Sequence, residues 1–104
     1  MTEQKENNKE VKCVWVLTHS WADRFGGNED EPKAFMREEN AKRVFKELVD
    51  GYKEEKPLFD GVYSQDIVVE EDEAEDVLDF YAYEEGCAER NNIHVNLRRC
   101  IIED

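Results

Sequence analysis

The sequence predicts a single α+β domain in which a small antiparallel sheet, of about four to five strands, packs against one amphipathic helix. Short stretches that alternate apolar and polar residues are typical of strands, and they lie on both sides of one stretch with helical periodicity. A length of 104 residues suits one domain. Residues 1–10 are polar and charged without apolar periodicity, so we expect a disordered tail at 1–10 and the domain at 11–104.

The first half of the chain predicts two strands and the helix. Residues 11–19 (VKCVWVLTH) are apolar on both alternating faces, which favours an internal strand, and 20–32 is expected to be a loop. Residues 33–36 predict a short strand at a sheet edge, because Pro32 precedes it. A helix is predicted at 38–55 from one continuous apolar stripe. The stripe consists of Ala41, Val44, Phe45, Leu48, Val49 and Tyr52.

The second half predicts three further strands. Residues 62–69 and 77–84 are the first two, and 85–91, which contains a glycine, forms the hairpin loop that follows them. The last strand is predicted at 92–102, with its apolar residues on one face. Arg99 interrupts that face near the end of the strand, so we expect a bulge or an edge position there.

The charge of the chain is strongly negative and unevenly distributed. There are 27 acidic and 14 basic residues, with a net charge of −13. Between Lys56 and Arg90 there is no Lys or Arg, and the run 70–76 is acidic except for one alanine. We expect like charges of this density to disfavour a regular buried element. The surplus argues against direct binding to nucleic acid or an anionic membrane, and it favours a basic protein surface as the partner.

This acidic segment suggests a small intracellular protein-binding module, in one form an inhibitor or decoy that mimics nucleic acid. Carboxylates spaced on an ordered scaffold imitate a phosphate backbone, and nearby tyrosines supply the aromatic anchors that interfaces favour. The predicted partner-binding residues are Glu70, Glu71, Asp72, Glu73, Glu75, Asp76, Asp79, Tyr81 and Tyr83. Two plainer alternatives stay open: a solvated acidic loop that keeps the protein soluble, and a homodimer joined through an uncovered edge strand.

A small hydrolase, metal-dependent or acid–base, is the alternative from a different class. It would use His19, Asp23 and His94. We expect no enzyme, because neighbours on a strand point to opposite faces and His19 would not meet Ser20. We also expect no metal and no cofactor, since no spacing such as CxxC or HExxH is present.

The cysteines and the hydropathy favour a cytoplasmic protein. Cys13, Cys87 and Cys100 have no CxxC spacing and are odd in number, which is typical of free thiols in a reducing compartment. The first residues lack the apolar stretch of a signal peptide. No apolar run approaches the roughly 20 residues that a membrane span needs.

One resemblance covers about a third of the chain. The segment VWVLTHSWADRFGG (14–27), followed by a short strand and a helix, resembles a group of small uncharacterised bacterial and phage-associated proteins that open with a "WVLTH" strand. AYEEG (82–86), followed by NIHVN (92–96), is similar to their closing hairpin. The resemblance implies a strand–strand–helix unit and a phage or mobile-element origin, but no activity and no functional residue. In this chain Met36 and Arg37 stand where the group commonly has a serine before the helix.

Overall fold

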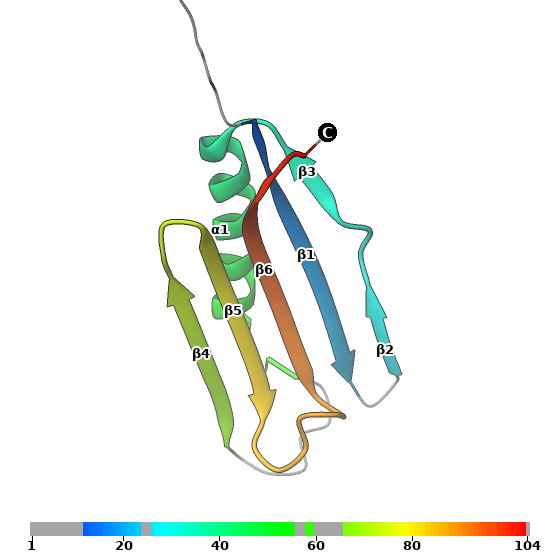
Figure 1. The fold of residues 1–104 in the computed structure, drawn as a ribbon. Helices are drawn as coiled ribbons and strands as arrows, with labels where there is room; N and C mark the ends of the chain where they lie inside the picture. Colours follow the sequence, from blue (N-terminus) through cyan, green and yellow to red (C-terminus); the bar gives the residue numbers. More distant parts are fainter. Residues whose placement is uncertain (1–11, 24–25, 56–57, 60–65, 104) are drawn as a thin grey trace, which may run out of the picture.

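The computed structural model describes residues 12–23, 26–55, 58–59 and 66–103. These residues form a six-stranded antiparallel sheet with one helix against one of its faces (Figure 1), which confirms the predicted fold class. The strands are β1 (Cys13–Asp23), β2 (Gly26–Glu29), β3 (Lys33–Phe35), β4 (Ile67–Glu73), β5 (Val77–Glu84) and β6 (Asn92–Ile101), and the helix is α1 (Glu38–Glu54).

The last strand in the sequence occupies the middle of the sheet. The strand order is β2-β1-β6-β5-β4, and β3 pairs with β1 on the same side as β2. The first and last strands therefore pair with each other in the β1–β6 ladder, which runs from the Cys13–Ile101 pair to the Ala22–Asn92 pair. β4 forms one edge of the sheet, while the short strands β2 and β3 share the other. The prediction that the first strand is internal is confirmed.

The core lies between α1 and the sheet. Alternation in β1, β5 and β6 directs one apolar row from each strand toward the helix. The helix packs over β1 and β6 with its predicted apolar stripe. The buried apolar residues are Trp15, Leu17, Ala41, Phe45, Val49, Phe59, Phe80, Ala82, Ile93, Val95 and Leu97.

Helix α1 begins and ends close to the predicted limits. Arg37 precedes it with an extended backbone and makes no side-chain capping hydrogen bond, consistent with the absence of a serine or threonine there. Glu38 and Glu39 lie at the positive N-terminal end of the helix, and Lys53 lies in its last turn. Glu55 is extended again, so the helix ends one residue before the predicted limit.

Two predictions about the ends of strands are wrong. Residues 20–32 are not a loop throughout, because β1 continues to Asp23 and β2 folds back along it. The alternation simply persists, with Trp21 packed against the core. There is also no bulge at Arg99, since the register of β6 on β1 is unbroken. The Arg99 Nη2 lies 2.8 Å from Asp76 Oδ1 in the β4–β5 turn, which neutralises the charge that interrupts the apolar face.

Other predictions fall partly outside the described residues. The tail at 1–10 and positions 62–65 of the third predicted strand are among them. The described part of that strand begins at Ile67 and ends at Glu73, four residues beyond the predicted end at Val69. The strands at 33–36 and 77–84 are present, and the hairpin loop contains Gly86 with a φ of 81°. This left-handed conformation is one that glycine adopts without a steric cost.

Candidate functional site

The face of the sheet opposite α1 is not covered by any element of the described chain (Figure 1, where α1 lies behind the sheet). Alternation sends one row of side chains from each strand to this side, and the register places the rows next to each other. We use the term open face for the part formed by β4, β5 and β6. It consists of Val68, Glu70, Asp72, Val77, Asp79, Tyr81, Tyr83, Asn92, His94, Asn96 and Arg98.

Two tyrosines of β5 form the centre of the open face. The ring centroids of Tyr81 and Tyr83 lie 4.9 Å apart, and the His94 ring meets Tyr81 edge-on at 5.4 Å. Tyr83 Oη donates a hydrogen bond of 3.3 Å to Glu70 Oε2 on the neighbouring strand. Desolvation, and then the charge of Glu70, raise the pKa of Tyr83 above its ordinary value. Tyr83 is therefore a neutral phenol at physiological pH, and its side chain is partly buried.

A polar cluster lies beside the tyrosines. Asp79 Oδ1 is 2.6 Å from His94 Nε2 and accepts a hydrogen bond of 2.8 Å from Asn96 Nδ2. The His94 side chain is 44% exposed, whereas the Asp79 side chain is 22% exposed. The carboxylate thus fixes the imidazole against the Tyr81 ring while leaving its outer side open to a partner. This arrangement pre-orders the surface and reduces the side-chain entropy that binding would cost.

The acidic run is an ordered strand through Glu73, so the alternative of an acidic loop is wrong for residues 70–73. β4 pairs with β5 without interruption from Ile67–Glu84 to Glu73–Leu78. The strand tolerates its charges because it lies at the sheet edge, where the acidic side chains are exposed to water. Apolar and aromatic neighbours on β5 supply the packing that the acidic residues lack.

The structure divides the predicted binding residues among three places. Five of them share the open face: Glu70, Asp72, Asp79, Tyr81 and Tyr83. Glu71 and Glu73 point to the helix side, where Glu71 Oε1 lies 2.9 Å from Lys53 Nζ. Glu75 and Asp76 lie in the turn that follows β4. Within the described chain, Asp72, Glu73 and Glu75 form no ion pair, which leaves their charge available to a partner.

A second polar arrangement lies on the helix side. His19 Nδ1 is 2.8 Å from Asp30 Oδ2, and His19 Nε2 is 2.6 Å from Tyr52 Oη. Burial, then the charges of Glu55 and Asp30, raise the pKa of Tyr52, so its phenol stays neutral. His19 thus connects the Tyr52 hydroxyl to the Asp30 carboxylate through its two ring nitrogens. This chain joins α1 to β1 and to the segment after β2.

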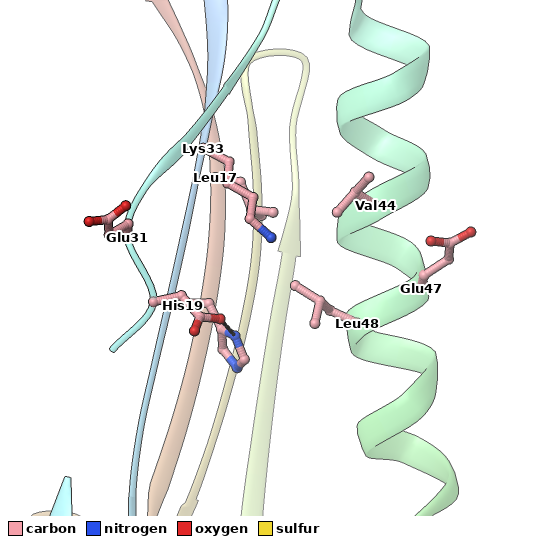
Figure 2. Close-up of a pocket in the computed structure, with 8 residues that line it drawn as sticks. Leu17, His19, Glu31, Lys33, Val44, Glu47 and Leu48 are labelled. Atoms are coloured by element: carbon pink, nitrogen blue, oxygen red, sulfur yellow. Dashed lines mark hydrogen bonds and ion pairs between the residues drawn. The ribbon is translucent and has the colours of Figure 1, made fainter. Parts of the chain in front are cut away.

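A hollow of about 230 Å³ adjoins His19 between β1 and α1. Figure 2 shows Leu17 and His19 of the sheet facing Val44 and Leu48 of the helix, with Lys33 directed into the same gap. The hydrogen bonds use both nitrogens of His19. A raised pKa also makes Tyr52 a poor nucleophile at neutral pH. The arrangement is well suited to joining elements and poorly suited to proton transfer to a substrate.

The grouping of His19, Asp23 and His94 in one catalytic site is wrong. His19 pairs with Val95, so its side chain lies on the helix side of the sheet. His94 lies on the open face against Tyr81. Two histidines on opposite faces of one sheet cannot act on the same substrate atom.

The structure also bears on the predictions about the cysteines, a metal site and a membrane span. Cys13, Cys87 and Cys100 are free thiols, and Cys13 and Cys100 lie on adjacent strands. In the described ranges, no group of three or more His, Cys, Asp or Glu side chains is arranged to hold a metal ion. The only described helix, α1, lacks the length and the apolar character needed to cross a membrane.

The fold and the open face together define a small α+β domain with an aromatic and anionic sheet surface. Searches with the chain against known protein families, curated proteins and solved structures find no match. The sequence did not reveal His94, Asn96 and Arg98 as part of this surface. The alternation of the last strand places these three residues on one face of that strand. It assigns them to the open face only when the strand is known to lie beside β5.

Proposed function

We propose that this chain is a protein-binding module, without enzymatic activity of its own, that binds a basic protein surface with the open face and with β4. The observation that carries the proposal is the position of the Tyr81–Tyr83 pair, which lies beside the carboxylates of Glu70 and Asp79 on paired strands. Aromatic residues next to fixed anions suit arginine, because guanidinium stacks on a ring and forms paired hydrogen bonds to a carboxylate.

The order of the surface supports binding rather than a role in solubility alone. The rings and carboxylates are held by the β4–β5–β6 ladders, and Asp79 is fixed by two neighbours. A rigid anchor loses little entropy on association, and tyrosine is among the residues that dominate interface energies. A net charge of −13 would also speed the encounter with a cationic protein, most strongly at low salt.

The finer form of the proposal is mimicry of nucleic acid. Along one face of a strand, side chains repeat about every 6.8 Å, so β4 places two carboxylates at this spacing on each face, Glu70 and Asp72 on the open face and Glu71 and Glu73 on the helix side. A protein that binds a phosphate backbone would accept such a row in its own groove. An inhibitor or decoy carried by a phage or mobile element would act in this way, and nucleic acid would then compete with it for the partner.

A crosslinking experiment identifies the partner and tests the surface at once. A photoreactive phenylalanine replaces Tyr81 in one variant and Arg43, on the outer side of α1, in the matched control. A protein captured from position 81 and absent from position 43 is then purified, and its affinity for the unmodified chain is measured by calorimetry. We expect the double change Tyr81→Ala and Tyr83→Ala to weaken that affinity at least about tenfold, because central interface tyrosines contribute more than 1.4 kcal/mol.

The contribution of charge is tested with two variants of equal net charge. One changes Glu70, Glu71 and Glu73 to Gln and Asp72 to Asn, while the control changes Glu29, Glu39, Glu54 and Glu103 to Gln. We expect the first variant to bind more weakly and with a smaller salt dependence than the control. Equal affinities for the two variants, or binding unaffected by loss of both tyrosines, would refute the proposal. Displacement of the partner by a DNA duplex tests the mimicry.

A further inference from the structure

The backbone of β4 has an outer side that the described chain leaves open. The bonds from Ala74 N to Val77 O and from Glu85 N to Asp66 O bracket the β4–β5 ladder. In an antiparallel ladder, hydrogen-bonded pairs alternate with non-bonded pairs. The even-numbered residues of β4 therefore bond to β5, and the odd-numbered residues turn their N–H and C=O groups outward. These outward residues are Ile67, Val69, Glu71 and Glu73.

This edge differs from the opposite edge of the sheet. β2 and β3 have four and three residues, and Pro32 precedes β3, so neither offers a long regular edge. β4 has seven residues, contains no proline, and keeps one register along β5. Figure 1 shows β4 at the margin of the sheet with no described element beyond it. A regular strand with unpaired outward groups is a template for the addition of another strand.

The side chains of β4 determine which strand can be added. The first part of the strand, 67–69, is apolar, and Val69 is 48% exposed. The second part, 70–73, is entirely acidic. A second copy of β4 in antiparallel alignment would set Glu70 against Glu70 and would place the acidic residues 71–73 opposite the apolar residues 67–69, so it would bring no cation to any carboxylate. A segment with basic residues opposite 70–73 and apolar residues opposite 67–69 would complement both parts.

We propose that the partner of this protein adds an extended basic segment to the outer edge of β4 as an antiparallel strand. The inference rests on the proposed function and specifies how the partner binds. The orientation follows from the sheet, in which every pair of strands is antiparallel. In the direction of its own chain, the added segment is basic first and apolar last, so that its basic half meets the acidic end of β4.

A synthetic peptide provides a defined probe. The end-capped heptapeptide Lys-Arg-Lys-Arg-Val-Ile-Val places its first residue opposite Glu73 and its last opposite Ile67. Its third and fifth residues then direct their N–H groups toward β4, and its second, fourth and sixth direct theirs away. Methylation of the third and fifth amide nitrogens blocks strand addition. Methylation of the second and fourth amide nitrogens is the matched control, because it leaves the charge of the peptide and its hydrogen bonds to β4 unchanged.

Amide hydrogen exchange of the full chain, followed by NMR at low salt, is the measurement. When the peptide occupies about nine-tenths of the protein, exchange at Ile67, Val69, Glu71 and Glu73 should slow by up to about tenfold, since only the free fraction exchanges. Amides that already bond to β5 should change little. The control peptide should reproduce the effect, and the peptide methylated at positions three and five should not.

The variant Val69→Pro tests the same edge from the protein side. It removes one outward N–H and keeps every carboxylate, and proline is tolerated at an edge strand when its missing N–H faces solvent. We expect at least about tenfold weaker binding of the heptapeptide. Unchanged exchange at the amides that bond to β5 shows that the sheet is intact. If it is not, the methylated peptides decide the question on the unaltered chain.

The remaining outcomes overturn the inference, and they separate it from the proposed function. If the two methylated peptides bind equally well, and their binding disappears only when the four acidic residues of β4 are neutralised, strand addition is refuted and an anionic binding surface remains. A peptide with the same residues in reverse order, Val-Ile-Val-Arg-Lys-Arg-Lys, tests the orientation. If that peptide slows amide exchange in β4 and the original heptapeptide does not, the antiparallel orientation is refuted. If amide exchange at the same residues slows when the protein concentration is raised without any peptide, the edge of β4 binds a second copy of this chain. A partner that is insensitive to the loss of both tyrosines, or that does not distinguish the two charge variants, would refute the proposed function instead.

Discussion

The change Tyr52→Phe isolates one hydrogen bond that joins helix α1 to the sheet. It removes the hydroxyl that lies 2.6 Å from His19 Nε2 and leaves the ring, which is stacked on Phe80 with centroids 6.3 Å apart. The His19 side chain is 10% exposed, so its Nε2 is left nearly buried and without this hydrogen-bond partner. An unsatisfied buried polar group costs about 1–3 kcal/mol. We expect the free energy of unfolding to fall by that amount.

Urea denaturation followed by fluorescence measures this loss, with Tyr52→Ala as a companion. The alanine variant also loses the half-buried ring, so it should be less stable than the phenylalanine variant. In a thermal scan, each kcal/mol corresponds to roughly 4–8 °C for a domain of this size. A Tyr52→Phe variant within 0.3 kcal/mol of the original chain, roughly the error of such measurements, would refute the hydrogen-bonded chain from Asp30 through His19 to Tyr52.

The same variant has a distinct pH dependence. Burial raises the folded-state pKa of Tyr52 above the ordinary value of 10.0, and the charges of Glu55 and Asp30 add to this. Above that ordinary value the unfolded chain loses the phenol proton more readily than the folded chain. The contribution of Tyr52 is therefore complete below pH 10 and is lost as the pH rises through the folded-state pKa. Tyr52→Phe should reduce the slope of stability against pH in this alkaline range, and an unchanged slope would contradict the shift.

Three further predictions concern charge and backbone. Raising NaCl from low to physiological concentration should raise the melting temperature, because screening weakens repulsion within 70–76; a fall would contradict it. Arg99→Ala should cost less than about 1 kcal/mol, since its ion pair with Asp76 is half-exposed, and a high-salt melt should abolish the difference. Gly51→Ala, in an open helical position, should stabilise by about 0.5–1 kcal/mol, whereas Gly86→Ala, at a φ of 81°, should destabilise by about 1–2 kcal/mol in urea titrations.

The sequence was sufficient for those elements whose periodicity is local. The stripe of α1 and the alternation of β6 each lie within one continuous stretch, and packing against the core preserved both. The acidic run was harder because propensity and charge both argue against a strand. Its pairing depends on β5, whose alternating apolar residues face the helix, so tertiary context overrode local preference. The residues of the acidic run alone do not reveal that β5 will pair with them.

The separation of the two histidines shows the same limit. The sequence shows which residues of each strand share a face with His19 or with His94. It does not show which of the two faces of the sheet each set occupies. That depends on the register of β6 on β1, which sets Ser20 against His94 and His19 against Val95. A shift of one residue would have placed both imidazoles on the same face. A candidate site composed of distant segments therefore depends on register, which one sequence does not specify.

The acids of β4 also determine whether the protein associates with itself. In the antiparallel alignment that pairs the outward residues along the whole strand, Glu70 would face Glu70 at one strand spacing, about 4.8 Å, while Glu71 and Glu73 would face Val69 and Ile67. At roughly 4 Å, two unit charges repel by about 1 kcal/mol in bulk water and more near a protein surface. The neighbouring carboxylates of the two strands add to this repulsion, so the acids of β4 oppose self-association through this edge.

Screening should reverse this balance, because the Debye length falls from about 30 Å at 0.01 M salt to about 3 Å at 1 M. We expect sedimentation equilibrium to show a monomer at low salt and measurable self-association at 1 M NaCl. The variant with all four acids neutralised should associate at low salt, while the control with four neutral residues elsewhere should not. A wild-type dimer at low salt would mean that the acids do not guard this edge, and selection of a basic strand by charge would lose its physical basis.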